Sequence, residues 1–360
     1  MDLLLRFFRT GGWVVLLLHG VVASVQAQSG VTAAPFLTIS PDARLSGMGE
    51  AGTGVAGTPA AAVWNSAALA FRYSPEQNRS TAWATYSNYL AQAAGAIHYA
   101  AGGYTQNLSM IDGVVSGHVT YLSLGQLEQR DDARQLVSQY SNYDLEVGVS
   151  YSTMLAGNLA AGIQGKYILS GRGVDGGASQ RGTGATVAFD VGALWRTDTV
   201  QLLLGKGRIG VGASLQNVGP KLSYLTADAA EPLPTTFRFG GSADIEFDDD
   251  LGLLLAADIS KLLVNRESGI PDPVPVSLVT GWNNGGFGFG FGLEMALRKR
   301  FAFRAGLNSR PGVADQSDSF GTLGAGVWVG PVVLDFSYLL PLQSNHPLAN
   351  TMRFSVSGDL

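Results

Sequence analysis

Twelve residues alternate strictly between large apolar and small or charged side chains: Phe287-Gly288-Phe289-Gly290-Phe291-Gly292-Leu293-Glu294-Met295-Ala296-Leu297-Arg298. Successive side chains of a β-strand point to opposite faces of its sheet. The stretch therefore predicts a strand with one wholly apolar face and one small or charged face.

The same period of two recurs elsewhere in the chain, in segments 185–196, 236–247 and 351–360. Their polar faces carry mainly glycine, serine, threonine and isolated charges. A soluble β-sandwich would instead expose lysine and glutamate to bulk water. The pattern favours a membrane β-barrel with lipid outside and a polar lumen inside.

Composition narrows the class of protein. Of 360 residues, 46% are apolar, 14% are charged and 48 are glycine, and there is no cysteine. After residue 30 no apolar run reaches the roughly 18 residues that a membrane helix needs. A large soluble β-protein is the alternative that composition alone leaves open. The net charge of −5 argues against nucleic acid as a partner.

The number of strands follows from the connections between them. Fifteen segments after residue 79 are candidate strands, whereas bacterial single-chain barrels have an even number, with short periplasmic turns and longer outer loops. Short and long connections alternate only if segment 275–284 belongs to one outer loop, 262–286. Pro271, Pro273 and Pro275 support this, because proline cannot donate to a strand ladder. We predict an all-β, 14-stranded antiparallel transmembrane barrel over residues 80–360.

Two segments precede the barrel. Residues 1–27 have the features of a cleaved signal peptide: Arg6 and Arg9, an apolar core from Trp13 to Val22, and small residues at Val25 and Ala27. Residues 28–79 do not alternate and are rich in glycine, alanine and proline. We expect them to form an irregular plug within the lumen; a water-filled pore would leave them outside it.

The sequence contains only weak matches to the motifs of cofactor, metal or catalytic sites. The G-x-G-x-x-G matches at 47–52 and 171–176 lack the strand and helix that dinucleotide binding requires. His98, His118 and His346 are far apart, and the acidic turn 248–250 offers too few oxygen ligands for calcium. We expect no catalytic, metal or cofactor site. Charges on the polar strand faces are expected to pair across the barrel: Arg238, Asp244, Glu246, Asp258, Glu294 and Arg353.

Several strings together resemble the PorV family of the type IX secretion system. They span the mature chain: 34–37, 39–44, 47–52, Trp64-Asn65-Ser66-Ala67, 217–224, 258–263, 303–306, 334–338 and 345–351. The serine at 66 departs from the proline of the family's Trp-Asn-Pro-Ala. Leu360 stands where barrels usually end in an aromatic residue, and loop 262–286 is shorter than is typical of the family.

The resemblance implies a FadL-like barrel in the outer membrane of a Gram-negative bacterium, of the Bacteroidota or a relative. It also implies a non-catalytic carrier that binds the C-terminal signal domain of secreted cargo. The carrier would take cargo from the translocon and deliver it to the attachment complex, with outer-membrane lipid around it. A FadL-like transporter of hydrophobic small molecules is the main alternative, and a lipopolysaccharide-modifying enzyme is a third.

A carrier needs an outer surface that holds a folded β-domain and then releases it. Loops on a rigid scaffold commonly supply such surfaces, and the long connections 126–141, 218–234, 262–286 and 341–349 are the candidates. Trp282, Tyr140 and Tyr143 are the expected cargo-binding anchors, because a few residues usually dominate an interface. The alternative for these aromatics is a position at the lipid headgroups.

Overall fold

The computed structural model describes residues 32–74, 79–90, 97–130, 135–173, 181–224, 230–267, 269–283, 285–298, 300–310, 318–342 and 348–360. The expected signal peptide, residues 1–27, lies outside this part of the chain, as does His346.

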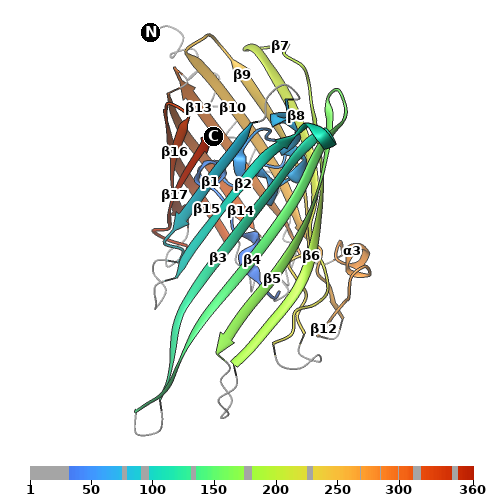
Figure 1. Cartoon of the computed structure of the whole chain (residues 1–360), viewed down its shortest axis with the longest axis vertical. Helices are drawn as coiled ribbons and strands as arrows, with labels where there is room; N and C mark the ends of the chain where they lie inside the picture. Colours follow the sequence, from blue (N-terminus) through green and yellow to red (C-terminus); the bar gives the residue numbers. More distant parts are fainter. Residues whose placement is uncertain are drawn as a thin grey trace.

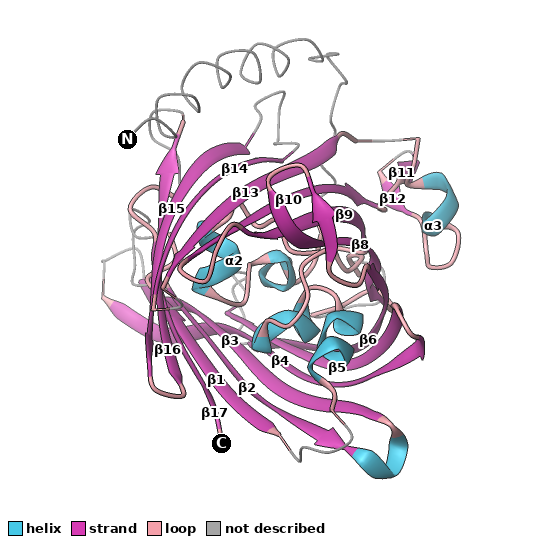
Figure 2. Ribbon diagram, turned by 90° about the horizontal axis from the view of Figure 1, so that it is seen from above, coloured by secondary structure: helices cyan, strands magenta, loops and turns pink. Residues whose placement is uncertain are grey.

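The described residues form a closed antiparallel barrel (Figures 1 and 2). Its strands are β1 (Ser80–Ser87), β2 (His98–Leu108), β3 (Gly113–Arg130), β4 (Leu136–Ala156), β5 (Leu159–Gly173), β6 (Arg181–Arg196), β8 (Gly205–Val218), β9 (Thr236–Glu246), β10 (Leu251–Leu262), β13 (Phe287–Leu297), β14 (Phe301–Arg310), β15 (Asp318–Val329), β16 (Val332–Pro341) and β17 (Met352–Asp359).

Closure of the wall depends on two pairings. β1 pairs with β17, from Thr81 opposite Asp359 to Ser87 opposite Arg353, and β6 pairs with β8. The sheet has fifteen strands, but the three-residue β7 (Val200–Leu202) pairs only with β8 among the described residues, which leaves fourteen in the wall. Closure leaves no unpaired edge in lipid. The predicted fourteen strands are confirmed.

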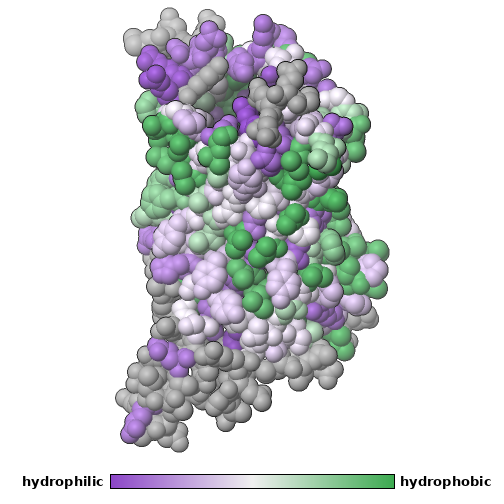
Figure 3. All heavy atoms as spheres, in the orientation of Figure 1, coloured by the Kyte–Doolittle hydropathy of each residue, from purple (hydrophilic) through white to green (hydrophobic). Residues whose placement is uncertain are grey.

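The alternation predicted from the sequence describes the two faces of this wall. On β13, Phe289 and Phe291 are 56% and 50% exposed, whereas Glu294 on the other face is 5% exposed. On β6, Phe189 is exposed and Asp190 is buried. The exposed apolar side chains give the middle of the outer surface its green colour in Figure 3. The outward face is therefore apolar, as contact with lipid requires.

The connections divide the barrel into two ends. At one end they are short, as at Gly330-Pro331 between β15 and β16 and at 247–250 between β9 and β10. We call this the short-turn end; by the usual pattern it faces the periplasm. The opposite long-loop end carries the longer connections, including the one between β10 and β13.

The loop between β10 and β13 confirms one prediction. Segment 275–284 is not a strand of the wall, since it contains the short helix α3 (Ser277–Thr280). Before it lies a two-residue hairpin of β11 (Arg266–Glu267) and β12 (Ile270–Pro271). In Figure 2 this hairpin and α3 project sideways from the wall.

One of the expected loops is instead largely strand. β3 and β4 continue to pair as far as Arg130 opposite Leu136, so the expected loop 126–141 is wrong. β5 and β6 also pair over their whole length, as far as Gly173 opposite Arg181. Backbone pairing continues past the 9–11 residues that cross a bilayer, since residues beyond the membrane can still complete each other's ladder.

Irregular turns and short helices fill the barrel. They are η3 (Pro35–Thr38), α2 (Ala43–Gly47), η4 (Pro59–Val63) and η5 (Ser66–Arg72), and a further turn, η6 (Ser109–Ile111), joins β2 to β3. We call residues 32–74 the N-terminal segment. It lies inside the ring of strands (Figure 2), as predicted. None of the helices formed by the described residues has the length and apolar character needed to cross a membrane.

Candidate functional site

The N-terminal segment lies directly against glycines on the inner face of the wall. A methyl group added at Gly292 of β13 would overlap the Met48 carbonyl oxygen, and one at Gly306 of β14 would overlap the Gly49 nitrogen. Gly49 itself has a φ of 62°, a conformation that favours glycine. Gly290 and Gly292 of the Phe-Gly repeat are therefore positions where the backbone of the segment docks on the wall.

A cluster of buried charges joins the same part of the segment to the wall. Arg44 of α2 forms a bidentate ion pair with Glu294 of β13, with nitrogen–oxygen distances of 2.8 and 2.7 Å. Glu294 also accepts from Nε of Arg304, on β14. The Nη1 atom of Arg304 lies 2.7 Å from the Asp335 carboxylate of β16. Two guanidinium groups thus face two carboxylates, so the cluster is neutral, as buried charges require.

Two further contacts extend this attachment. Asp258 of β10 accepts hydrogen bonds from the backbone nitrogens of Gly52 and Thr53, at 3.0 and 2.9 Å, and from the Thr53 hydroxyl at 2.6 Å. Arg310 of β14 forms an ion pair with Glu50. Backbone donors that would otherwise be buried without partners are satisfied by the wall.

The second half of the segment is held mainly by small side chains. Asn65 caps η5 by accepting from Ala67, and its amide donates to the Thr53 carbonyl at 2.8 Å. The alanines of η5 pack against β4, β5 and β6. The guanidinium carbon of Arg238, on β9, lies over the Trp64 ring, 3.8 Å from the ring centre. The Trp64-Asn65-Ser66-Ala67 string is therefore a packing and capping unit.

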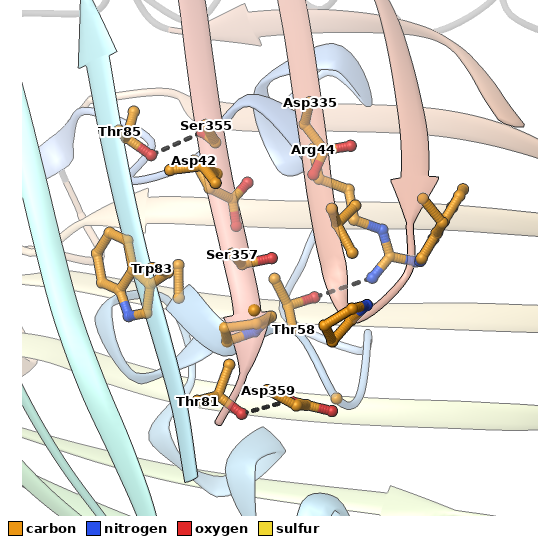
Figure 4. Close-up of a pocket in the computed structure, with 18 of the residues that line it drawn as sticks. Asp42, Arg44, Thr58, Thr81, Trp83, Thr85, Asp335, Ser355, Ser357 and Asp359 are labelled. Atoms are coloured by element: carbon orange, nitrogen blue, oxygen red, sulfur yellow. Dashed lines mark hydrogen bonds between the residues drawn. The ribbon is translucent and has the colours of Figure 1, made fainter. Parts of the chain in front are cut away.

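A pocket of about 350 Å³ opens at the short-turn end, between the segment and the wall (Figure 4). Asp42, Arg44 and Thr58 line it from the segment; β1 and β17 contribute hydroxyl groups, such as Thr85 and Ser355, which lie 2.6 Å apart. Trp83 and Trp328 add aromatic surface. The lining therefore combines charged and hydroxyl groups with apolar surface.

Burial alters the ionisation of Asp42, which lines this pocket. One carboxylate oxygen accepts from the Leu45 nitrogen at 2.7 Å as the N-cap of α2, and the other has no hydrogen-bond partner among the described residues. Burial raises the pKa of Asp42 to about 6, although the Leu45 bond opposes the rise. Loss of water around an unpaired carboxylate disfavours its charged form.

On the opposite wall, buried charges pair with one another. Lys166 of β5 lies 2.7 Å from Asp190 of β6 and 3.7 Å from Glu146 of β4. Glu146 lies 3.1 Å from His118 of β3, and the amide of Asn217 accepts from Lys166. These side chains are 5% exposed or less. No group of three metal-ligating residues is present in the described part of the chain.

The predicted cross-barrel pairing of lumen charges is thus only partly right. Arg238 does reach across strands, donating to Gln216, and Asp244 pairs with Arg196. However, Asp258 and Glu294 bind the N-terminal segment, and Glu246 is exposed. The alternation of a strand shows which face of the sheet a side chain lies on, but it does not show which residue that side chain contacts. The remaining residue, Arg353, lies over the Tyr99 ring.

The residues predicted to bind cargo are dispersed. Trp282 is 44% exposed, donates to the Leu278 carbonyl at 3.0 Å and packs against Phe237 with ring centres 5.4 Å apart. Tyr143 lies on β4, not in a loop, and stacks on Tyr121 at 6.3 Å. Tyr140 also lies within β4, opposite Leu127.

Around Trp282 the structure adds residues that sequence reasoning missed. Ile270, Val276 and Val279 are 71%, 48% and 75% exposed on the same loop. We call these three residues and Trp282 the α3 patch. The loop is held by Lys221, which donates to the Pro271 carbonyl, and by an ion pair between Arg266 and Glu231. The sequence does show apolar residues in this proline-rich loop. It does not show that they are exposed, because apolar residues can equally pack inside a loop.

Comparisons with known proteins agree with this architecture. A family model described as type IX secretion system protein PorV matches residues 23–268. No curated protein matches the sequence. The crystal structure of the P. putida toluene transporter TodX is similar with a TM-score of 0.54 and 12% identity, over 88% of this chain and 97% of that one.

A second solved structure, described as a TodX deltaS2S3 mutant monoaromatic hydrocarbon channel, has a TM-score of 0.52 and 11% identity over 88% and 97% of the two chains. At such identities the likeness shows a shared FadL-like barrel fold.

Proposed function

The chain belongs to the PorV family of type IX secretion system proteins, and from this premise we propose that it is an outer-membrane cargo carrier. It would bind the C-terminal signal domain of a secreted protein, take it from the translocon and pass it to the attachment complex. The carrier itself would perform no chemistry.

The observation that carries this proposal is the packed interior. The N-terminal segment contacts the wall through backbone, through the neutral cluster of Arg44, Glu294, Arg304 and Asp335, and through Asp258. Such contacts favour a rigid scaffold over a passage that opens and closes. Binding would therefore take place on the outer surface at the long-loop end.

Two features of the long-loop end suit a large protein partner. The β3–β4 hairpin, with strands of 18 and 21 residues, extends well past the bilayer. The α3 patch presents apolar side chains on an ordered loop, and exposed apolar clusters of this kind commonly mark protein interfaces. We propose the α3 patch as a cargo contact, with Trp282 as its anchor; Tyr140 and Tyr143 stay secondary candidates.

Affinity capture from detergent extracts of the native organism tests the carrier role. The unmodified protein should recover secreted proteins that share a C-terminal domain. Val279→Asp should reduce this recovery by about tenfold or more, because a charge would have to be buried in an apolar contact. Val329→Asp is the matched control, since Val329 is similarly exposed but lies at the short-turn end.

Full recovery with Val279→Asp would exclude the α3 patch as a cargo contact. Capture of fatty acids or aromatic hydrocarbons without any secreted protein would contradict the carrier role. That result would favour a FadL-like transporter of small hydrophobic molecules, the second candidate suggested by the toluene transporter fold.

A further inference from the structure

The turns at the short-turn end differ around the barrel. Three consecutive turns, between β2 and β3, β4 and β5, and β7 and β8, carry large exposed apolar side chains. We call these side chains the apolar rim: Met110, Ile111, Leu155, Leu203 and Leu204. The exposed charges Asp112 and Lys206 stand beside two of these turns. Met110 and Leu203 are 94% and 98% exposed, so the barrel itself provides no cover for them.

The next two turns around the barrel are charged. We call their exposed residues the charged rim: Asp248, Asp249, Asp250, Arg298 and Arg300. The side chains of Asp250 and Arg298 are 71% and 77% exposed and form only a long ion pair of 3.9 Å. Charged groups with this exposure belong in water.

The apolar rim continues the lipid-facing surface of the same strands. On β4 the outward row includes Val147 and Val149 and ends at Leu155. On β5 it begins with Leu159 and continues to Ile163, both exposed. No charged side chain interrupts either row. The hydroxyls of Tyr151 and Thr153 in the β4 row donate to the Ile111 and Asp112 carbonyls of the β2–β3 turn.

The shape of the apolar rim also fits lipid. Its five members stand on three separate turns, and none of them lines the pocket described above. A lipid surface needs no shape complementarity. By contrast, exposed apolar side chains of this size in the periplasm would each cost free energy in water.

From these features we infer that the apolar rim is immersed in the inner leaflet of the outer membrane, whereas the charged rim stands in the periplasmic water. The barrel is then tilted, with the β2–β8 side displaced toward the cell exterior. β3 to β6, of 15 to 21 residues, run from this side (Figure 1). The tilt would lift the long-loop ends of these strands farther from the membrane.

The inference concerns lipid contact and does not depend on the carrier role. The absence of cysteine in the chain makes a direct test simple. Four single-cysteine variants, Met110→Cys, Leu203→Cys, Asp249→Cys and Arg300→Cys, would carry a nitroxide label in phosphatidylethanolamine–phosphatidylglycerol vesicles. All four positions are exposed, so the label should not disturb folding.

Collision rates with oxygen, which concentrates in lipid, and with a water-soluble nickel chelate report the depth of each label. The oxygen-to-nickel ratio should be several-fold higher at 110 and 203 than at 249 and 300. Equal ratios at all four positions would overturn the inference. So would a high nickel accessibility at 203 in vesicles that falls only when a partner protein is added, because the apolar rim would then be a protein interface.

A second measurement guards against an effect of the label. Leu203→Trp fluorescence should be quenched by lipids brominated on their acyl chains, whereas Asp249→Trp fluorescence should not, each measured as a difference from the unmodified protein. Equal added quenching at the two positions would contradict the inference.

Discussion

The buried charged residues in the two halves of the lumen wall have different kinds of partner. On β10, β13, β14 and β16, the charged residues Asp258, Glu294, Arg304 and Asp335 form a single system with the N-terminal segment. On β3 to β6, the charged residues His118, Glu146, Lys166 and Asp190 satisfy one another. The charges of the first half therefore hold the N-terminal segment, whereas those of the second half hold strands to one another; we call His118, Glu146, Lys166 and Asp190 the strut.

The glycines do not follow this division. On β13 and β14, glycine lets residues 48 and 49 of the segment touch the wall. On β5 and β6, Gly162 and Gly192 do the same for residues 65–67, beside the alanines of η5. Removing a charged docking contact should therefore release residues 42–53, whereas a change in the strut should weaken the strands and leave residues 42–53 in place.

The largest expected effect comes from Glu294→Ala. It would remove the bidentate partner of the partly exposed Arg44 and one of the two counter-charges of the buried Arg304, which should cost about 3–5 kcal/mol. Hydrogen exchange of residues 42–53 should become much faster. Glu146→Gln, the matched change in the strut, should leave exchange of residues 42–53 unchanged. Equal acceleration by both variants would remove the distinction between the two halves.

The ionisation of Asp42 should make docking depend on pH. Its pKa is about 6 in the folded protein and 3.8 in the exposed state. The neutral form is therefore favoured on folding, and this contribution is full below pH 4 and lost as pH rises through 6. A pKa difference of this size corresponds to about 3 kcal/mol.

Asp42→Asn tests this directly, because asparagine keeps the N-cap of α2 without a charge. The variant should be more stable than the unmodified protein in urea unfolding at pH 8 and nearly equal to it at pH 4. A constant difference at both pH values would show that Asp42 stays ionised.

A smaller effect is expected from Gly292→Ala. The added methyl group would overlap the Met48 carbonyl oxygen, and overpacking of this kind costs about 1–3 kcal/mol. Gly165→Ala is the control, since its methyl group would meet only the Phe189 ring, at 3.8 Å. Urea unfolding midpoints should fall for Gly292→Ala and hardly change for Gly165→Ala. A larger fall for Gly165→Ala would contradict docking by close backbone contact.

The sequence predicted the barrel well, because a period of two is imposed on every strand by lipid on one side. The even strand number and Pro271, Pro273 and Pro275 correctly removed segment 275–284 from the wall. The extent of β3 and β4 could not be predicted, because residues 126–130 and 136–141 continue to pair although their sequence lacks the alternating apolar pattern that lipid imposes.

The interior was predicted less completely. The glycines at 288, 290 and 292 indicated a small lumen-facing side, but small residues are equally suited to water or to a docked backbone. The docked backbone came from residues 47–52, some 240 positions earlier in the chain, and Arg44 and Glu50 gave no periodic signal. Such pairing depends on three-dimensional proximity, which one sequence does not contain.

The central claim is that the N-terminal segment stays docked while the long-loop end binds cargo. Hydrogen exchange with and without a purified cargo C-terminal domain tests it most directly. We expect residues 42–53 to stay equally protected in both states, and residues 270–283 to become more protected when cargo is bound. Faster exchange of residues 42–53 on cargo binding, with no change at 270–283, would contradict the claim.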